Sequence, residues 1–167
     1  RQFEQAGDAM GVARIHSNLG VVEYTDPQGN PEAAEHHWRE SLRVYRASGY
    51  QRGIAEILTN LGALAQQQET LDRAWGSYHE ALQIEQELHH PFGIGRALSN
   101  LGEVAELRGD AQHAYRLFAA AEAIFAELGS PHQQYTADLL YRAAAKLGRS
   151  EASVAQQRAS FKGRPED

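Results

Sequence analysis

The tripeptide Asn-Leu-Gly occurs three times in this chain, beginning at Asn18, Asn60 and Asn100, so that its copies are 42 and 40 residues apart. A second landmark, an alanine followed four residues later by an aromatic residue, recurs with a constant period of 40. Its copies are Ala34 with Trp38, Ala74 with Tyr78, and Ala114 with Phe118. Self-similarity at a fixed period of this length is typical of stacked supersecondary units, so the chain is predicted to be a repeat protein.

Residues that favour turns separate these landmarks with the same period. Those predicted to end the second helix of each repeat in a left-handed conformation are Gly7, Gly49, His89 and Gly129. Those predicted to mark the turn within each repeat are Gly29, Glu69, Gly109 and Gly148. The two extra residues of the first repeat fall in the segment 26–31, where proline, glycine and asparagine predict a turn.

Between the turns, apolar residues recur at helical spacing, and no strand pattern competes. The predicted helices cover residues 9–25, 31–48, 51–67, 71–88, 91–108, 111–128, 131–147 and 150–162. In the second repeat, Gly62 and Ala65 share one face of the first helix, and Ala74 and Tyr78 share the facing side of the second. The small residues let the two helix axes approach, and the aromatic ring fills the remaining space. One hairpin cannot bury its apolar face alone, so the hairpins are predicted to stack into one folded unit.

Composition argues against several classes of protein. Hydrophobic residues make up 42% and charged residues 23% of the 167 residues, which is typical of a globular chain. The net charge of −6 and the lack of a Lys/Arg cluster argue against a nucleic-acid surface in this segment. The sequence contains no cysteine, so disulfides and thiolate metal sites are excluded and a reducing, cytoplasmic location is expected. No apolar run approaches 18 residues, so no membrane-spanning segment is expected.

The landmarks resemble the tetratricopeptide signature, in which a large residue, Leu-Gly, a later alanine and an aromatic residue recur at fixed offsets. The matching residues are Leu58, Leu61, Gly62 and Ala65 in one repeat and Leu98, Leu101, Gly102 and Ala105 in the next. The first repeat departs from the signature, because His16 replaces the first large residue and Glu23 stands where a tyrosine is usual.

The common period of the tetratricopeptide family is about 34 residues. The longer repeat of this chain resembles those of kinesin light chain, of Pins-type polarity proteins and of bacterial ATPase-linked transcriptional regulators. The resemblance covers nearly the whole chain. It implies an all-α fold, a right-handed α-solenoid of about eight helices arranged as stacked antiparallel hairpins.

The register divides this single predicted domain into consecutive parts. Residues 1–8 align with the end of a preceding second helix, so at least one further repeat is expected upstream. Repeats 1, 2 and 3 cover residues 9–50, 51–90 and 91–130, and residues 163–167 are a tail. Residues 131–162 are predicted to be a degenerate capping repeat: Leu139-Leu140-Tyr141 replaces Asn-Leu-Gly, and the alanine–aromatic landmark is lost around Ser153 and Gln157.

In the families that this chain resembles, the first helices line the concave side of the superhelix and contact the ligand. The resemblance implies the same role for the stripe of each first helix that faces away from the core, because spacings of three and four place its residues on one face. The implied groove residues are Arg14, Ser17 and Asn18, then Glu56, Thr59, Asn60 and Ala63, and then Arg96, Ser99, Asn100 and Glu103.

The repeated asparagine has two interpretations. A carboxamide offers both a donor and an acceptor, so Asn18, Asn60 and Asn100 could form a ladder that clamps the backbone of an extended peptide. Alternatively, the three side chains hydrogen-bond between neighbouring helices and brace the stack. Arg14 and Arg96 could meet an acidic ligand, but glutamates share the same region, and a solvated helix face explains the charges equally well.

The sequence does not favour an enzyme. No phosphate-binding glycine loop and no nucleophile constellation is present, so no catalytic residue and no cofactor are predicted. A metal site was considered at His36-His37 beside Glu32, Glu35 and Glu40, and at Glu87-x-x-His90, which has the spacing of carboxylate-bridged di-iron bundles. Those bundles need two such motifs and two further glutamates. Only one motif is present, so exposed histidines are expected and no metal is predicted.

Two hypotheses of different classes remain. The first is a protein–protein interaction module whose concave groove binds a peptide or a partner protein, as part of a larger bacterial regulatory or signalling protein. The second is a structural spacer or oligomerisation arm without a dedicated peptide ligand. The repeats are compatible with a homo-oligomer of this chain. The expected partner is a protein or peptide, not a nucleic acid or a membrane.

Overall fold

The computed structural model describes the backbone of residues 2–162 and, within it, the side chains of residues 9–150, 152–156 and 158. This part of the chain contains eight helices and no strand. It divides into two compact units, Arg1–Leu88 and His89–Asp167. The prediction of one continuous domain stays a prediction. No helix in the described part is both long and apolar enough to cross a membrane.

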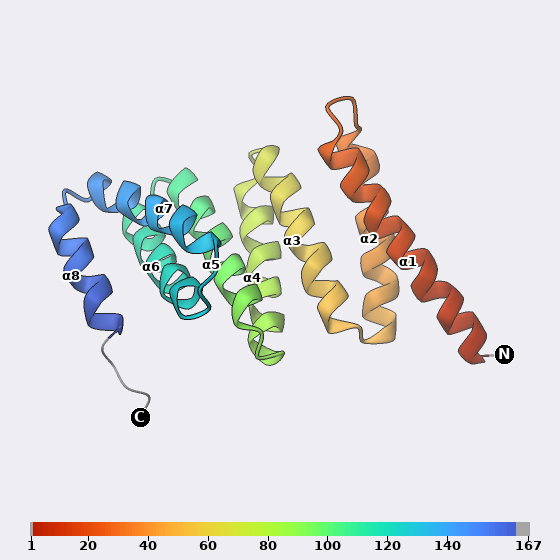
Figure 1. Cartoon of the computed structure of the whole chain (residues 1–167). Coiled ribbons are helices and arrows are strands. Elements are labelled where there is room, and N and C mark those ends of the chain that lie inside the picture. Colours follow the sequence, from red (N-terminus) through yellow and green to blue (C-terminus); the bar gives the residue numbers. More distant parts are fainter. Residues whose placement is uncertain (1, 163–167) are drawn as a thin grey trace. The chain divides into compact units, whose positions relative to one another are not determined.

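The first unit consists of two antiparallel hairpins (Figure 1). Its helices are α1 (Gln2–Thr25), α2 (Pro31–Ser48), α3 (Gln51–Gln67) and α4 (Leu71–Glu87). Within this unit α1 packs on α2, α2 on α3 and α3 on α4. Its core combines small residues with a few large ones, among them Trp38, Ile57 and Leu64, which are almost fully buried. Sequential packing of this kind is what the repeat pattern predicts.

The glycine of each Asn-Leu-Gly triplet lies against the aromatic residue of the second helix in its hairpin. A Cβ atom added to Gly62 would lie 2.6 Å from the Tyr78 ring. Equivalent atoms on Gly20 and Gly102 would lie 2.5 Å from Trp38 and Phe118, respectively. Because real Cβ contacts are not that short, only glycine allows this approach. The two sequence landmarks are therefore the two sides of one close helix–helix contact.

The predicted turn positions are mostly confirmed. Gly49, Gly109, Gly129 and Gly148 have positive φ, and Glu69 and His89 adopt the same conformation without being glycine. Gly29 serves a different purpose: a Cβ atom there would lie 2.0 Å from the carbonyl oxygen of Glu23. Next to it, Asn30 caps α2 by accepting hydrogen bonds from the backbone amides of Glu32 and Ala33 at 2.9 and 3.3 Å.

The predicted turn at Gly7 is wrong. α1 is continuous from Gln2 to Thr25, whereas the sequence pattern predicts a helix that begins at residue 9. Glycine adopts helical backbone angles as well as left-handed ones, so α1 passes through Gly7 without a break. The assignment of residues 1–8 to a preceding repeat involves side chains outside those that the structure describes.

The second unit contains α5 (Pro91–Leu107), α6 (Ala111–Glu127), α7 (His132–Lys146) and α8 (Glu151–Lys162). α5 packs on α6 and α6 on α7. Phe118 and Phe125 lie at the centre of this packing, and the ring of Phe125 contacts those of Phe92 and His132. In Figure 1, α8 turns away from α7 and does not run back along it as α6 does along α5.

The degenerate repeat keeps more of the landmark than the sequence analysis assigned. At a period of 40, the residues that follow Ala114 and Phe118 are Val154 and Arg158, one position later than Ser153 and Gln157. Val154 is 1% exposed. The Arg158 guanidinium donates to the buried Glu122 carboxylate of α6 and, at 3.1 Å, to the Tyr141 hydroxyl of α7. An arginine with buried polar partners thus stands where the other repeats have a ring.

Candidate functional site

Four of the predicted groove residues line one cavity in the first unit. This cavity has a volume of about 450 Å³ and lies between α1 and α3, the first helices of the two hairpins. It is lined by Gly11, Arg14, Ile15, Ser17 and Asn18 of α1, by Tyr45 and Tyr50, and by Glu56 of α3. Thr59, Asn60 and Ala63 are further residues of α3 that do not line the cavity, and each is half-buried. The first helices of this unit therefore do enclose a recess.

The cavity combines both signs of charge with aromatic rings. Arg14 and Glu56 are exposed at its edge, and the rings of Tyr45 and Tyr50 meet edge-on with centroids 5.2 Å apart. Burial raises the pKa of Tyr45, the nearby Glu56 carboxylate raises it further, and Arg14 opposes the increase. The Tyr45 hydroxyl therefore stays protonated at neutral pH. A peptide in this cavity would meet a cation, an anion and aromatic surface.

The three repeated asparagines occupy similar positions but differ in exposure. Asn18 is exposed, while Asn60 and Asn100 are half-buried. None of the three carboxamides takes part in the hydrogen bonds recorded among the described residues. Thr59, by contrast, donates to the Ala55 carbonyl of its own helix at 2.9 Å. The asparagines thus keep donors and acceptors for water or a ligand.

The two serines of the stripe are less accessible than predicted. Ser17 and Ser99 are each only 6% exposed. The backbone carbonyl of Ser17 accepts a hydrogen bond of 3.2 Å from the Trp38 indole, which ties this position to the interior of the first hairpin. A small side chain fits there because the aromatic residue of the second helix lies close. Packing therefore explains these serines at least as well as ligand contact does.

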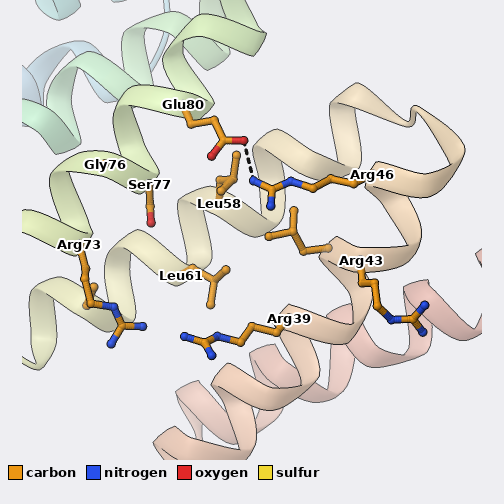
Figure 2. A pocket seen from close by; sticks show the side chains of 11 residues that line it. Arg39, Arg43, Arg46, Leu58, Leu61, Arg73, Gly76, Ser77 and Glu80 are labelled. Atoms are coloured by element: carbon orange, nitrogen blue, oxygen red, sulfur yellow. Dashed lines mark hydrogen bonds and ion pairs between the residues drawn. The ribbon is translucent and has the colours of Figure 1, made fainter.

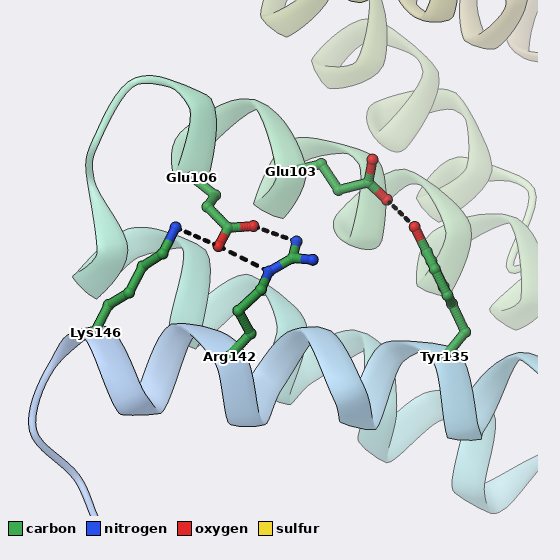
Figure 3. Close-up of polar contacts among 5 residues, drawn as sticks. All are labelled: Glu103, Glu106, Tyr135, Arg142 and Lys146. Atoms are coloured by element: carbon green, nitrogen blue, oxygen red, sulfur yellow. Dashed lines mark hydrogen bonds and ion pairs between the residues drawn. The ribbon is translucent and has the colours of Figure 1, made fainter.

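In the second unit, part of the predicted stripe already has partners within the chain. Arg96 and Asn100 are half-buried on α5. Glu103 accepts a hydrogen bond of 2.9 Å from the hydroxyl of Tyr135 on α7 (Figure 3). Burial and this hydrogen bond both raise the pKa of Tyr135. Glu103 is therefore less available to a ligand than its position in the sequence suggests.

One turn further along α5, Glu106 joins two cations of α7 (Figure 3). Arg142 donates to its carboxylate from Nε at 3.0 Å and also from Nη2, and Lys146 donates at 2.7 Å. The hydrogen bond from Arg142 is the main cause that lowers the pKa of Glu106, with Lys146 contributing and burial opposing. Glu106 is one of the glutamates that share the region of Arg14 and Arg96 in the sequence, and its partners could not be predicted because they are 36 and 40 residues away.

A larger groove lies on another surface of the first unit, where the sequence analysis placed no site. It has a volume of about 730 Å³ and lies between α2 and α4, with α3 at its floor (Figure 2). It is lined by Arg39, Leu42, Arg43 and Arg46 of α2, by Leu58, Leu61 and Ala65 of α3, and by Arg73, Gly76, Ser77 and Glu80 of α4. The sequence signal that could have predicted this groove is the helical spacing of Arg39, Arg43 and Arg46, which places three cations on one face of α2.

The arginines of this groove already hold carboxylates of the chain. Arg46 pairs with Glu80 at 2.7 Å (Figure 2). Arg39 and Arg73 both contact one oxygen of Glu35, at 2.7 and 2.5 Å. The Arg46–Glu80 and Arg73–Glu35 pairs link α2 to α4, whereas the Arg39–Glu35 pair lies within α2. The arginines are exposed, so water screens these pairs and each contributes little to stability.

The histidines form no metal site within the described residues, where no cluster of three or more potential ligands occurs. They are not all free, exposed side chains either. His16, which replaces a large residue of the repeat signature, has its Nδ1 atom 2.9 Å from Nδ1 of His37. One ring must donate and the other accept, so this pair joins α1 to α2.

Comparisons with known proteins identify the fold. No protein-family model matches the sequence, and no curated protein matches it. Among solved structures, the apo form of RapI is 15% identical with a TM-score of 0.81, covering 91% of this chain and 56% of RapI. A Rap protein complexed with competence and sporulation factor is 17% identical with a TM-score of 0.69, covering 98% of this chain and 45% of that protein.

BtubC (BKLC) from P. vanneervenii is 18% identical with a TM-score of 0.67, and the match covers 98% of this chain and 78% of that protein. The chain spans about half the length of the two Rap structures. At identities this low the likeness concerns the fold alone. The fold of this chain is thus a tetratricopeptide-like helical repeat, built from consecutive antiparallel hairpins.

Proposed function

We propose that this chain is a protein-interaction module that binds an extended peptide segment of a partner along the first helices of its first unit, α1 and α3, with the α1–α3 cavity as the principal site. The observation that carries the proposal is the asparagine repeated on α1 and α3, at Asn18 and Asn60, whose carboxamides make no hydrogen bond within the described residues. An amide that can donate and accept suits a peptide backbone in either direction.

The cavity supports this proposal by its chemistry. Asn18 and Arg14 line it from α1 and Glu56 from α3, and the rings of Tyr45 and Tyr50 complete the lining. Aromatic rings provide contact area with little loss of conformational entropy, and the two charges would fix the direction of a bound segment. The same fold occurs in a Rap protein that was solved with a bound factor.

The proposal includes the setting of the module. We place it in the cytoplasm, as part of a larger bacterial regulatory protein of the long-repeat variety that resembles kinesin light chain, Pins-type proteins and ATPase-linked regulators. Catalysis is no part of this role. A structural spacer is the competing function. In a spacer the asparagines would brace neighbouring helices, whereas in the proposed module they bind the peptide.

Selection from a phage-displayed library of random linear peptides tests the proposal, with the wild-type chain as target. The selected peptides should bind wild type and bind the Asn18→Ala, Asn60→Ala double variant at least ten-fold more weakly, while the melting temperature changes little. Gln83→Ala, which removes an exposed amide from α4, is the matched control and should bind as wild type does.

Two results would contradict the proposal. The first is that selection enriches no peptide whose binding depends on the asparagines. The second is that the double variant melts at a much lower temperature than wild type. The second result would assign the asparagines to bracing the hairpins and would favour the spacer.

A further inference from the structure

α1 presents a row of large aliphatic side chains to solvent. Val12, Ile15, Leu19 and Val22 are 49, 59, 42 and 57% exposed. Their spacings of three, four and three place them along one face of the helix, and we call this row the α1 stripe. Contiguous exposed apolar surface is uncommon on a folded protein and marks an interaction site.

The equivalent residues of α3 are covered. They lie 42 positions further along the chain, at Ile54, Ile57, Leu61 and Leu64. Ile54, Ile57 and Leu64 are 6, 0 and 2% exposed, and Leu61 packs against the core cluster. α1 and α3 each have a second helix after them, but only α3 packs on a second helix that comes before it, namely α2. The four residues of α3 are therefore buried because α2 packs on them, and the equivalent residues of α1 are exposed because no described helix packs on them in that way.

A glycine gives independent support for the same missing neighbour. A Cβ atom on Gly53 would lie 2.5 Å from the ring of Tyr50, just before α3, and 2.6 Å from the ring of Tyr45, which α2 presents to α3. The equivalent residue of α1 is Gly11, and a Cβ atom there would have nothing within 4 Å. A glycine inside a helix lowers helix stability relative to alanine, and no described neighbour makes use of the space at Gly11.

We propose that the α1 stripe docks the second helix of a preceding repeat hairpin, and that this helix presents an aromatic ring over Gly11 as Tyr45 does over Gly53. The offset between ring and glycine is eight residues in the observed pair.

A second copy of the chain fits the stripe less well. Head-to-tail association would bring α8 to α1, because α8 is the second helix of the last hairpin. The exposed side chains that the structure describes on α8 are Ala152, Ser153, Ala155 and Gln156. They provide neither large apolar surface nor a ring for Gly11.

The proposal is tested by whether Gly11→Ala raises or lowers the melting temperature in each of two chains. The first is the 167-residue chain. The second is the same chain with residues 1–8 replaced by a copy of residues 9–50, which places another α2, with its tyrosine eight residues before Gly11. In the first chain Gly11→Ala should raise the melting temperature by about 2–4 °C, because alanine favours the helix and meets no neighbour. In the extended chain it should lower the melting temperature.

Controls separate packing from helix preference. Gly53→Ala should lower the melting temperature in both chains, because its aromatic neighbour is always present. Val12→Asp should leave the 167-residue chain nearly unchanged, because Val12 is exposed and does not line the α1–α3 cavity. It should destabilise the extended chain, as a charge buried under a docked helix would.

Two outcomes would overturn the proposal. If Gly11→Ala raises the melting temperature in both chains, no ring lies over Gly11 in the extended chain. If sedimentation shows that the 167-residue chain is a stable dimer, and Val12→Asp dissociates it, the occupant of the stripe is a second copy.

Discussion

At the scale of single residues, the fold depends on pairs in which a glycine faces a ring. Gly20, Gly62 and Gly102 each admit the aromatic side chain of the following helix to a distance at which any Cβ atom would collide. These pairs could be predicted from the sequence because both members recur with the same period. The surface ion pairs could not, since they depend on where side chains 34–40 residues apart come to lie.

Gly62→Ala should destabilise the chain by about 1–3 kcal/mol, because the added methyl group forces the Tyr78 ring or the α3 axis to move. Gly76→Ala is the matched control: this exposed glycine of α4 has nothing near its Cβ position, and alanine there should stabilise by about 0.5–1 kcal/mol. Urea unfolding followed by circular dichroism measures both values. Equal effects at the two sites would show that the ring contact is unimportant.

The Glu106 cluster should make the stability of the second unit depend on pH. The lowered pKa of Glu106 means that its ion pairs contribute fully above its ordinary value near 4.5 and are lost as the pH falls through the lower, folded-state value. Wild type should therefore lose more stability between pH 6 and pH 3 than Glu106→Gln does. Urea unfolding at both pH values measures the difference, and parallel losses in the two proteins would contradict the assignment.

At the scale of helices, the sequence predicted the ends of α2 to α8 to within about one residue. Glycines and prolines between amphipathic segments leave little freedom there, and the left-handed residues close each helix as expected. α1 is the exception, since Gly7 has the same residue type as Gly49 but lies inside a helix. A glycine permits a left-handed turn without requiring one, so a glycine at the repeat period does not by itself end a helix.

Removing α7 and α8 should be much more harmful than removing α8 alone. α7 packs along α6 and contributes Leu140 and Ala143 to the buried interior of the second unit. Deletion of residues 131–167 should therefore expose the α5–α6 hairpin and cause aggregation or partial unfolding. Deletion of residues 151–167 should leave a folded monomer with a lower melting temperature. Size-exclusion chromatography and circular dichroism measure both, and a stable monomer after the larger deletion would show that α7 is no cap.

At the scale of the whole molecule, the period of 40 was enough to predict a helical repeat and the position of each hairpin. The candidate site was predictable only in part. Arg14, Ser17, Asn18 and Glu56 do line one cavity. Helical spacing places the first three on one face of α1, and the packing of α1 and α3 on α2 brings Glu56 to the same cavity. The larger groove between α2 and α4 was missed, since it arises from the distance between two second helices and not from a pattern within either one.

The order of packing also has a kinetic consequence. Within each unit, every pair of extensively packed helices is consecutive in the chain, and the longest polar links span about 40 residues. Chains with such low contact order fold quickly, because closing short loops costs little entropy. Each hairpin can therefore form as soon as its two helices have left the ribosome, and the next can add to it before synthesis is complete.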